Sequence, residues 1–287
     1  MVVDDGSAPG RVAGCLRELA GCTDLQLGPY STQLMRSANQ VLPELDILLW
    51  NHGGSGDDVE SARPGRLVSV LAPTSRYAEP FVRMLAAADQ RIPLVLVAGR
   101  GRFGRQVIDG AELIARQLEL PTARLELGDA PTSEPWNLFC AATFEEDVDT
   151  VRRALALPNP PHVIGSVAAG VHEFGEAMPA ATGIYGIAQW LPGRTAPPQL
   201  GPTEAEFLAA FGSACDYPAI QAVAAATIAT HCARISGLEA DALWHTATTL
   251  RTSTLLGHFA IDPVTGAQVA HRPVLTRWDR TGPHPVP

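Results

Sequence analysis

The amino-acid sequence predicts an α/β protein whose parallel sheets are flanked by helices, and three observations predict it. Short apolar segments alternate with longer segments of helical periodicity. Two neighbouring apolar segments, near residues 27 and 50, each stop in glycine and hydroxyl residues. A second alternation begins at Pro93, so the chain contains two similar halves. Alternating strands and helices favour a parallel sheet.

The first half begins with an apolar pair, Val2 and Val3, which we interpret as a strand. Residues 8–22 place Val12 and Leu16 on one face, which predicts a helix. The following elements are expected in order: a strand over 25–27, a helix over 32–41, strands over 45–50 and 67–71, and a helix over 77–88.

The second half begins with a near-continuous apolar strand over 94–98, followed by a glycine-rich loop over 99–104. Further strands are expected over 138–142, 162–167, 185–190 and 274–278, with a strand and turn over 257–266. Helices are expected over 105–118, 145–155, 174–178, 203–213, 217–236 and 238–250.

The composition restricts the partners and the compartment. With 46% hydrophobic residues, the chain has ample material for buried cores. A net charge of −9, with no cluster of basic residues, argues against nucleic acid or an anionic membrane as partner. No apolar run reaches the roughly 18 to 20 residues of a membrane span. The acidic residues at the start are unlike a signal peptide, so we expect a cytoplasmic chain as written, or an extracytoplasmic one if the true N-terminus lies upstream.

Cysteines and histidines do not indicate a metal site or a cofactor. The five cysteines are an odd set without a CxxC spacing, which predicts reduced thiols, with a Cys15–Cys22 bridge as the alternative. The histidines lack the spacing of zinc ligands. The loop over 99–104 lacks the complete patterns of phosphate loops. We therefore predict no metal and no cofactor.

The strongest candidate site lies after the two strand ends, because ligands of open α/β sheets bind beyond the carboxyl ends of strands. The residues there are small or carry hydrogen-bonding groups: Tyr30, Ser31, Thr32, Asn51, His52, Gly53, Gly54 and Ser55. Ser31 and Thr32 either contact a ligand or cap the following helix, and a capped helix start still offers N–H groups. Tyr77 is a further candidate for lining the mouth of this site, with a core role as the alternative.

His52 is the most specific single candidate and has three readings. A neutral imidazole could donate or accept a hydrogen bond from a ligand. A catalytic base would need a partner carboxylate and a substrate proton within reach. The third reading is an ordinary loop histidine.

The order of these features resembles type I periplasmic solute-binding proteins of the branched-chain amino-acid and amide branch. The most specific segments are Gly28-Pro29-Tyr30-Ser31-Thr32, the loop over 101–104, and residues 257–266 with Trp278 beyond them. The resemblance covers about residues 1–280. It implies two lobes, 1–92 with 203–260 and 93–190 with 261–287, and a connector over 191–202 near the hinge. In such proteins a small ligand binds in the cleft between two closing lobes.

The resemblance also implies which residues touch the ligand. The loop with Tyr30, Ser31 and Thr32 would hold a ligand carboxylate or amide, and the loop over 53–55 would be the second loop of that lobe. The second lobe would contribute Arg102, Phe103, Thr143, Phe144, Ala169 and Gly170.

Three departures from the family pattern stand out. The strand and helix that open the family's first lobe are missing, so that lobe is expected to be truncated at its N-terminus. Ala169 falls where amino-acid binders keep an acidic residue for the ligand amine, unless Glu173 or Glu145 replaces it. A secretion signal is also missing.

These observations predict a non-catalytic protein that binds an amino acid, an amide or a related carboxylate, as a solute-binding protein or a cytoplasmic sensor. Its expected partners are the ligand and an ABC transporter or a regulatory protein, and a homodimer is compatible with the sequence. The alternative is an enzyme on the same scaffold, with His52 as acid or base beside Ser55 or Asp57. A third reading is an interaction protein that accepts a strand at the gap in its sheet.

Overall fold

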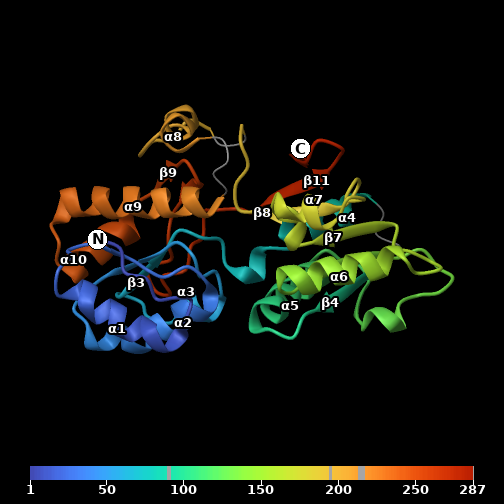
Figure 1. The fold of residues 1–287 in the computed structure, drawn as a ribbon, viewed down its shortest axis with the longest axis horizontal. Coiled ribbons are helices and arrows are strands. Elements are labelled where there is room, and N and C mark those ends of the chain that lie inside the picture. Colours follow the sequence, from blue (N-terminus) through green and yellow to red (C-terminus); the bar gives the residue numbers. More distant parts are fainter. Residues whose placement is uncertain (89–91, 194–195, 213–216, 287) are drawn as a thin grey trace. The chain divides into compact units, whose positions relative to one another are not determined.

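The computed structural model describes residues 1–88, 92–193, 196–212 and 217–286, which form two compact units (Figure 1). Unit 1 comprises Met1–Pro73 and Pro192–Arg272, and unit 2 comprises Thr74–Leu191 and Pro273–Pro287. The expected lobe boundaries differ from this division. Residues 74–88 belong to unit 2, because the helix there packs against the first helix after residue 100. Residues 192–202 and 261–272 belong to unit 1.

Unit 1 contains a parallel sheet with the strand order β1-β2-β3. Its strands are β1 (Gln26–Leu27), β2 (Leu49–Asn51) and β3 (Leu67–Ser69). The helices around them are α1 (Pro9–Ala20), α2 (Thr32–Val41), a 3₁₀ turn (Leu42–Glu44) and α3 (Asp57–Glu60). This segment is the blue part of Figure 1.

The core of unit 1 follows from the amphipathic faces of its first two helices. α1 buries Val12 and Leu16, and α2 buries Leu34 and Met35. These side chains pack in one cluster with Leu49 and other apolar residues of the sheet. Each such side chain contributes about 1.5–3 kcal/mol when it is removed from water, so this cluster holds α1 and α2 against β2 and β3.

The C-terminal part of unit 1 adds helices and a hairpin. Its elements are α8 (Glu204–Phe211), α9 (Tyr217–Ser236), α10 (Ala240–Thr249) and the antiparallel pair β9 (Thr252–Thr254) and β10 (Gly257–Phe259). α9 contacts β1 and β2 and packs against α10 (Figure 1). α9 thereby covers the sheet that carries the candidate loops.

Unit 2 is built on a larger sheet with the order β12-β11-β8-β7-β6-β4-β5. Five strands are parallel: β4 (Leu94–Ala98), β5 (Thr122–Arg124), β6 (Asn137–Ala141), β7 (Val163–Ser166) and β8 (Tyr185–Ala188). The antiparallel strands are β11 (Val274–Trp278) and β12 (Pro283–Pro285). The helical elements are α4 (Glu79–Ala88), α5 (Arg102–Gln117), α6 (Phe144–Leu155), α7 (Glu173–Ala177) and 3₁₀ turns at Thr74–Arg76, Leu127–Asp129 and Ala168–Gly170.

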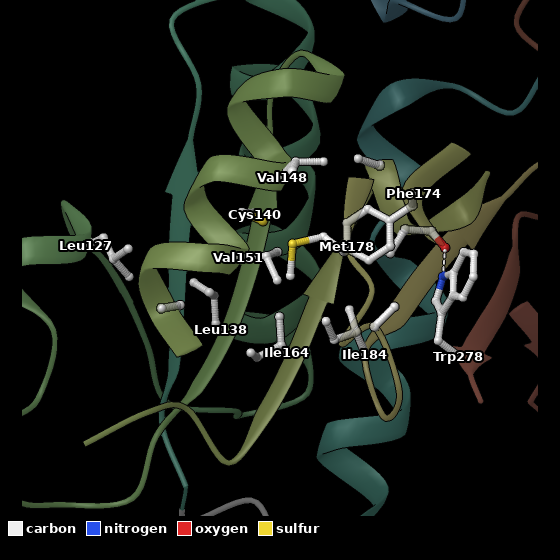
Figure 2. Close-up of a cluster of buried hydrophobic side chains, with 14 of the residues drawn as sticks. Leu127, Leu138, Cys140, Val148, Val151, Ile164, Phe174, Met178, Ile184 and Trp278 are labelled. Carbon is white, nitrogen blue, oxygen red and sulfur yellow. Dashed lines mark hydrogen bonds between the residues drawn. The ribbon is translucent and has the colours of Figure 1, made fainter. Parts of the chain in front are cut away.

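Side chains of β6 alternate between two cores because successive residues of a strand point to opposite faces. Leu138 and Cys140 belong to one cluster, and Phe139 belongs to the other. Figure 2 shows the first cluster, in which the Trp278 indole donates to the Ala169 carbonyl at 2.7 Å. That bond ties β11 to the turn after β7.

The predicted fold class is confirmed, and the helices over 32–41 and 217–236 and the strands over 94–98 and 274–278 lie where they were expected. The strand predicted at Val2 and Val3 is wrong: this segment is irregular, and Val2 is exposed. β5, β9 and β12 were not predicted. β5 is short and partly polar, and β12 begins and ends in proline, so neither shows the apolar alternation of a half-buried strand.

Candidate functional site

The loops after β1 and β2 meet at one edge of the sheet in unit 1. The two strands are adjacent and parallel, with Leu27 opposite Trp50, so their carboxyl ends lie together. The Tyr30 ring stacks on the His52 imidazole, with 6.5 Å between ring centroids and 29° between ring planes. A Cβ on Gly53 would lie 2.6 Å from the Tyr30 Cα, so the contact between the loops requires glycine there.

Asn51 holds the second loop in shape. Its Nδ2 donates to the Gly54 carbonyl at 2.6 Å and to the Ser69 Oγ at 3.1 Å. Its Oδ1 accepts from the N–H groups of Gly53 at 3.2 Å and Gly54 at 2.9 Å. An amide offers two donors and two acceptor sites, and these bonds occupy all four. This favours a positioning role over the predicted direct ligand contact.

Ser31 caps α2 with an unusual backbone. Its Oγ accepts from the Leu34 N–H at 3.2 Å, which makes Ser31 the N-cap and Thr32 the first helical residue. The Ser31 φ is 135°, a region that residues with a side chain rarely adopt. Such backbone costs of order 1–3 kcal/mol and clusters at ligand-binding and catalytic sites. The capping reading is confirmed, whereas ligand contact at Ser31 stays a prediction, which the strained backbone favours.

His52 is neutral at physiological pH. Burial lowers the pKa of its imidazole to about 4, and its Nδ1 is buried without a hydrogen-bond partner among the described residues. A neighbouring carboxylate would instead favour the protonated ring and raise the pKa. The environment of His52 therefore suits a neutral hydrogen-bonding group better than a general base.

Gly54 and Ser55 complete the loop. A Cβ on Gly54 would lie 2.6 Å from the Cγ of Met35, so this glycine permits the close approach of the loop to α2. Ser55 is buried beside it. The accessible residues of this candidate site are therefore Tyr30, which is 49% exposed, and the partly exposed Ser31, Thr32, His52 and Gly53.

Tyr77 and Phe103 both lie in unit 2, where their rings meet edge to face with 5.7 Å between centroids. Tyr77 was predicted in the lobe of the Tyr30 loop, and the division into units places it elsewhere. Arg102 begins α5 and is exposed. These three residues form a second group of predicted ligand contacts, within unit 2.

The other predicted contacts of unit 2 carry structural roles. Thr143 caps α6 in a reciprocal arrangement with Glu146, and Phe144 packs partly buried beside the core. Ala169 is fully buried, and its carbonyl accepts from Trp278. A Cβ on Gly170 would collide with the Ile187 carbonyl, so this glycine permits close backbone packing. Their contact with a ligand stays a prediction.

The described part of the chain holds neither a cluster of metal ligands nor a membrane-spanning helix. No group of three or more His, Cys, Asp or Glu side chains there could hold a metal ion. No described helix is long and apolar enough to cross a membrane. Four cysteines are free thiols: Cys15, Cys22, Cys140 and Cys232. Cys15 and Cys22 therefore do not form the alternative bridge. Cys215 lies outside the described residues.

Comparisons with known proteins support the fold at low sequence identity. No protein-family model matches the sequence, and no curated protein matches it. The leucine binding protein LivK from Thermotoga maritima matches with a TM-score of 0.80 and 12% identity, over 99% of this chain and 85% of LivK. An ABC transporter substrate-binding protein from Desulfitobacterium hafniense, in complex with Leu, matches with a TM-score of 0.78 and 12% identity, over 99% and 87%. A benzoate-bound solute binding protein from R. palustris matches with a TM-score of 0.74 and 14% identity, over 99% and 83%.

These similarities define the class of the fold. The chain folds like the type I periplasmic solute-binding proteins that serve ABC transporters, over nearly its whole length. The expected resemblance is therefore confirmed for the fold.

Proposed function

We propose that the protein binds a small polar molecule, an amino acid, an amide or a related carboxylate, without converting it chemically. The observation that carries this proposal is that the strained Ser31 and the neutral His52 lie in the two loops that meet after the adjacent strands β1 and β2. A helix start offers N–H groups to a carboxylate or carbonyl, and a neutral imidazole adds one further donor or acceptor.

The structural neighbours support the ligand class. Their bound ligands include leucine, isoleucine and benzoate, each of which joins a carboxylate to an apolar group. Ala169 stands where the family resemblance implies an acidic partner for a ligand amine, and Glu145 and Glu173 are exposed. Within the proposed ligand class, we therefore expect a carboxylate or amide without an ammonium group to bind more tightly than an amino acid.

The enzyme reading is the second candidate, and the site favours it less. A general base works best when its pKa lies near the working pH. Burial holds the pKa of His52 near 4, and it is the only cause of that shift. The site therefore supports binding in preference to acid–base catalysis.

The expected partner and compartment depend on which kind of binding protein this is. A solute-binding protein would deliver the ligand to an ABC transporter, whereas a cytoplasmic sensor would pass the signal to a regulatory protein or its own dimer partner. Arg102, Phe103 and Tyr77 are the residues of unit 2 that we propose as ligand contacts. Size-exclusion chromatography with light scattering tests the homodimer.

A ligand screen tests the proposed function. Purified protein is heated with amino acids, aliphatic amides, ureas and small carboxylates, and the unfolding temperature is recorded. A ligand at about 100 times its dissociation constant stabilises the fold by about 2.7 kcal/mol, which raises the unfolding temperature by a few degrees. Mass spectrometry of the recovered ligand then separates binding, which leaves it unaltered, from turnover. The absence of any shift would contradict the proposal.

A further inference from the structure

Unit 1 contains a cavity of about 400 Å³ that is continuous with the candidate site. Gly28, Pro29 and His52 of the two candidate loops form one part of its wall, and α1, β1 and the first residues of the chain form the rest. All its lining residues belong to unit 1. We propose that this cavity takes the apolar tail of a monocarboxylate whose head is held at the loops after β1 and β2. The inference rests on the function proposed above and narrows its ligand class.

The wall of the cavity presents apolar side chains that the protein core does not fully cover. Leu19, Leu25 and Leu27 line the cavity and are each partly exposed. Val12 and Leu16 also line it and belong to the buried core cluster of unit 1. Apolar surface in contact with water becomes more stable when a hydrocarbon group displaces that water. The lining therefore favours an apolar tail over a polar one.

The charges of the lining disfavour a second charged group at the far end of the tail. The cavity is lined by one carboxylate, Asp5, but by no Arg, and the chain has no Lys. The amino terminus belongs to Met1, which lines the cavity but is 75% exposed and therefore hydrated. A buried anion would need a cationic partner to offset its loss of hydration. The ligand is therefore expected to carry its charge only at the head.

The size of the cavity defines the probes. At roughly 30 Å³ for each water molecule in the liquid, the space corresponds to about 13 non-hydrogen atoms. Octanoate fits within this limit, whereas butanoate leaves most of the space unfilled. Octanedioate has the same length as octanoate but ends in a second carboxylate. These three ligands separate the length of the tail from its polarity.

Isothermal titration of the three probes at neutral pH tests the proposal. Burial of one methylene group strengthens binding by up to about fourfold, so octanoate should bind at least about tenfold more tightly than butanoate. Octanedioate should bind at least about tenfold more weakly than octanoate, because its second carboxylate would lose its hydration in the cavity.

Alkylation of two cysteines reports whether the tail occupies the cavity. Cys15 is a partly exposed free thiol in the lining, whereas Cys22 is an exposed free thiol outside it. Octanoate should slow the alkylation of Cys15 and leave that of Cys22 unchanged, and butanoate should protect neither. Tryptic cleavage after Arg17 places the two thiols in different peptides, which mass spectrometry distinguishes.

Substitutions separate the tail from the head of the ligand. Leu19→Trp should fill part of the cavity and weaken octanoate binding at least about tenfold, the loss of roughly two buried methylene groups, with little effect on butanoate. Leu238→Trp, at an exposed position of unit 1 outside the cavity, is the matched control and should bind octanoate as the wild type does. His52→Ala should weaken octanoate and butanoate by the same factor, because it acts on the head.

The outcomes distinguish this inference from the proposed function. Equal affinities of butanoate and octanoate, or an unchanged alkylation rate of Cys15 with octanoate bound, would overturn the inference and leave the proposed function standing. Tight octanoate binding that His52→Ala does not change would overturn the link between the cavity and the loops. The absence of saturable binding by all three carboxylates would also overturn the inference, and the ligand screen would then test the proposed function by itself.

Discussion

The Asn51 side chain is bonded twice to Gly54: it donates to the Gly54 carbonyl at 2.6 Å and accepts from the Gly54 N–H at 2.9 Å. A fully buried amide thus closes the loop after β2 on itself. His52 lies within this closed loop, and its ring reaches Tyr30 of the neighbouring loop. The geometry of the candidate site therefore depends on Asn51, whose side-chain donors and acceptors are all used within the protein.

Asn51→Leu should destabilise the protein by about 2–4 kcal/mol, because it breaks several bonds and leaves buried loop groups unpaired. Urea unfolding measures the effect. Gln40→Leu is the control for a polar-to-apolar change in the same unit and should stay within about 0.5 kcal/mol of the wild type. A loss of ligand binding in Asn51→Leu without loss of stability would instead indicate direct ligand contact.

Gly53→Ala should weaken ligand binding more than it weakens the fold. The new Cβ would meet the Tyr30 backbone and force the two loops apart, at a cost of about 1–3 kcal/mol in stability. Gly101→Ala is the matched control in unit 2, because a Cβ there meets nothing within 4 Å. The account fails if both variants bind the ligand as the wild type does.

His52 should titrate with a pKa near 4, because burial disfavours the imidazolium. The unfolded chain takes up this proton near pH 6.5, so His52 lowers the stability of the fold as the pH falls from about 6.5 to 4. Above that range the imidazole stays neutral, and ligand affinity should not change through its titration. NMR of the imidazole resonances, assigned with His52→Gln, measures the pKa directly. A titration midpoint of His52 near pH 6.5 would contradict this prediction, because it would show that water reaches the imidazole ring.

Glu60→Gln should stabilise the protein at neutral pH. The Glu60 side chain is 1% exposed, and burial raises its pKa well above 4.5, with a further increase from the charge of Asp57. The folded state therefore holds a proton that the unfolded chain releases, and stability falls as the pH rises above about 4.5.

Unfolding in urea at pH 4 and pH 7 tests this dependence. The stabilisation by Glu60→Gln should be large at pH 7 and small at pH 4. Glu18→Gln, at an exposed position of α1, controls for the change in net charge. Equal effects of Glu60→Gln at the two pH values would contradict the raised pKa.

The sequence was sufficient to predict the main elements where apolar periodicity is strong. Local pattern alone was enough to predict the apolar strand over 94–98 and the Ala-rich helix over 217–236. The meeting of the loops after residues 27 and 50 also followed from strand order alone. β5 and β12 could not be predicted, because their short, partly polar segments become strands only by pairing at the edges of an existing sheet.

The roles of individual site residues were harder to predict. Asn and Ser occur both as ligand contacts and as residues that brace a loop or cap a helix. Only the hydrogen-bond partners of Asn51 and Ser31 distinguish these roles, and the sequence does not show those partners. Gln26 was not singled out, because an isolated Gln in a strand gives no sign that its amide will be buried without partners. Ala169 falls at a ligand position by resemblance, and nothing in the sequence indicated that its side chain would be buried and its carbonyl bonded to the Trp278 indole; its contact with a ligand stays a prediction.

The most direct test of the account is calorimetric titration of the best ligand from the screen into the wild type, His52→Ala and Gly101→Ala. The account predicts saturable binding by the wild type, a loss of about tenfold or more in affinity for His52→Ala, the effect of about 1.4 kcal/mol, and no change for Gly101→Ala. The same affinity in all three proteins would contradict it, because the ligand would then bind away from the joined loops of β1 and β2.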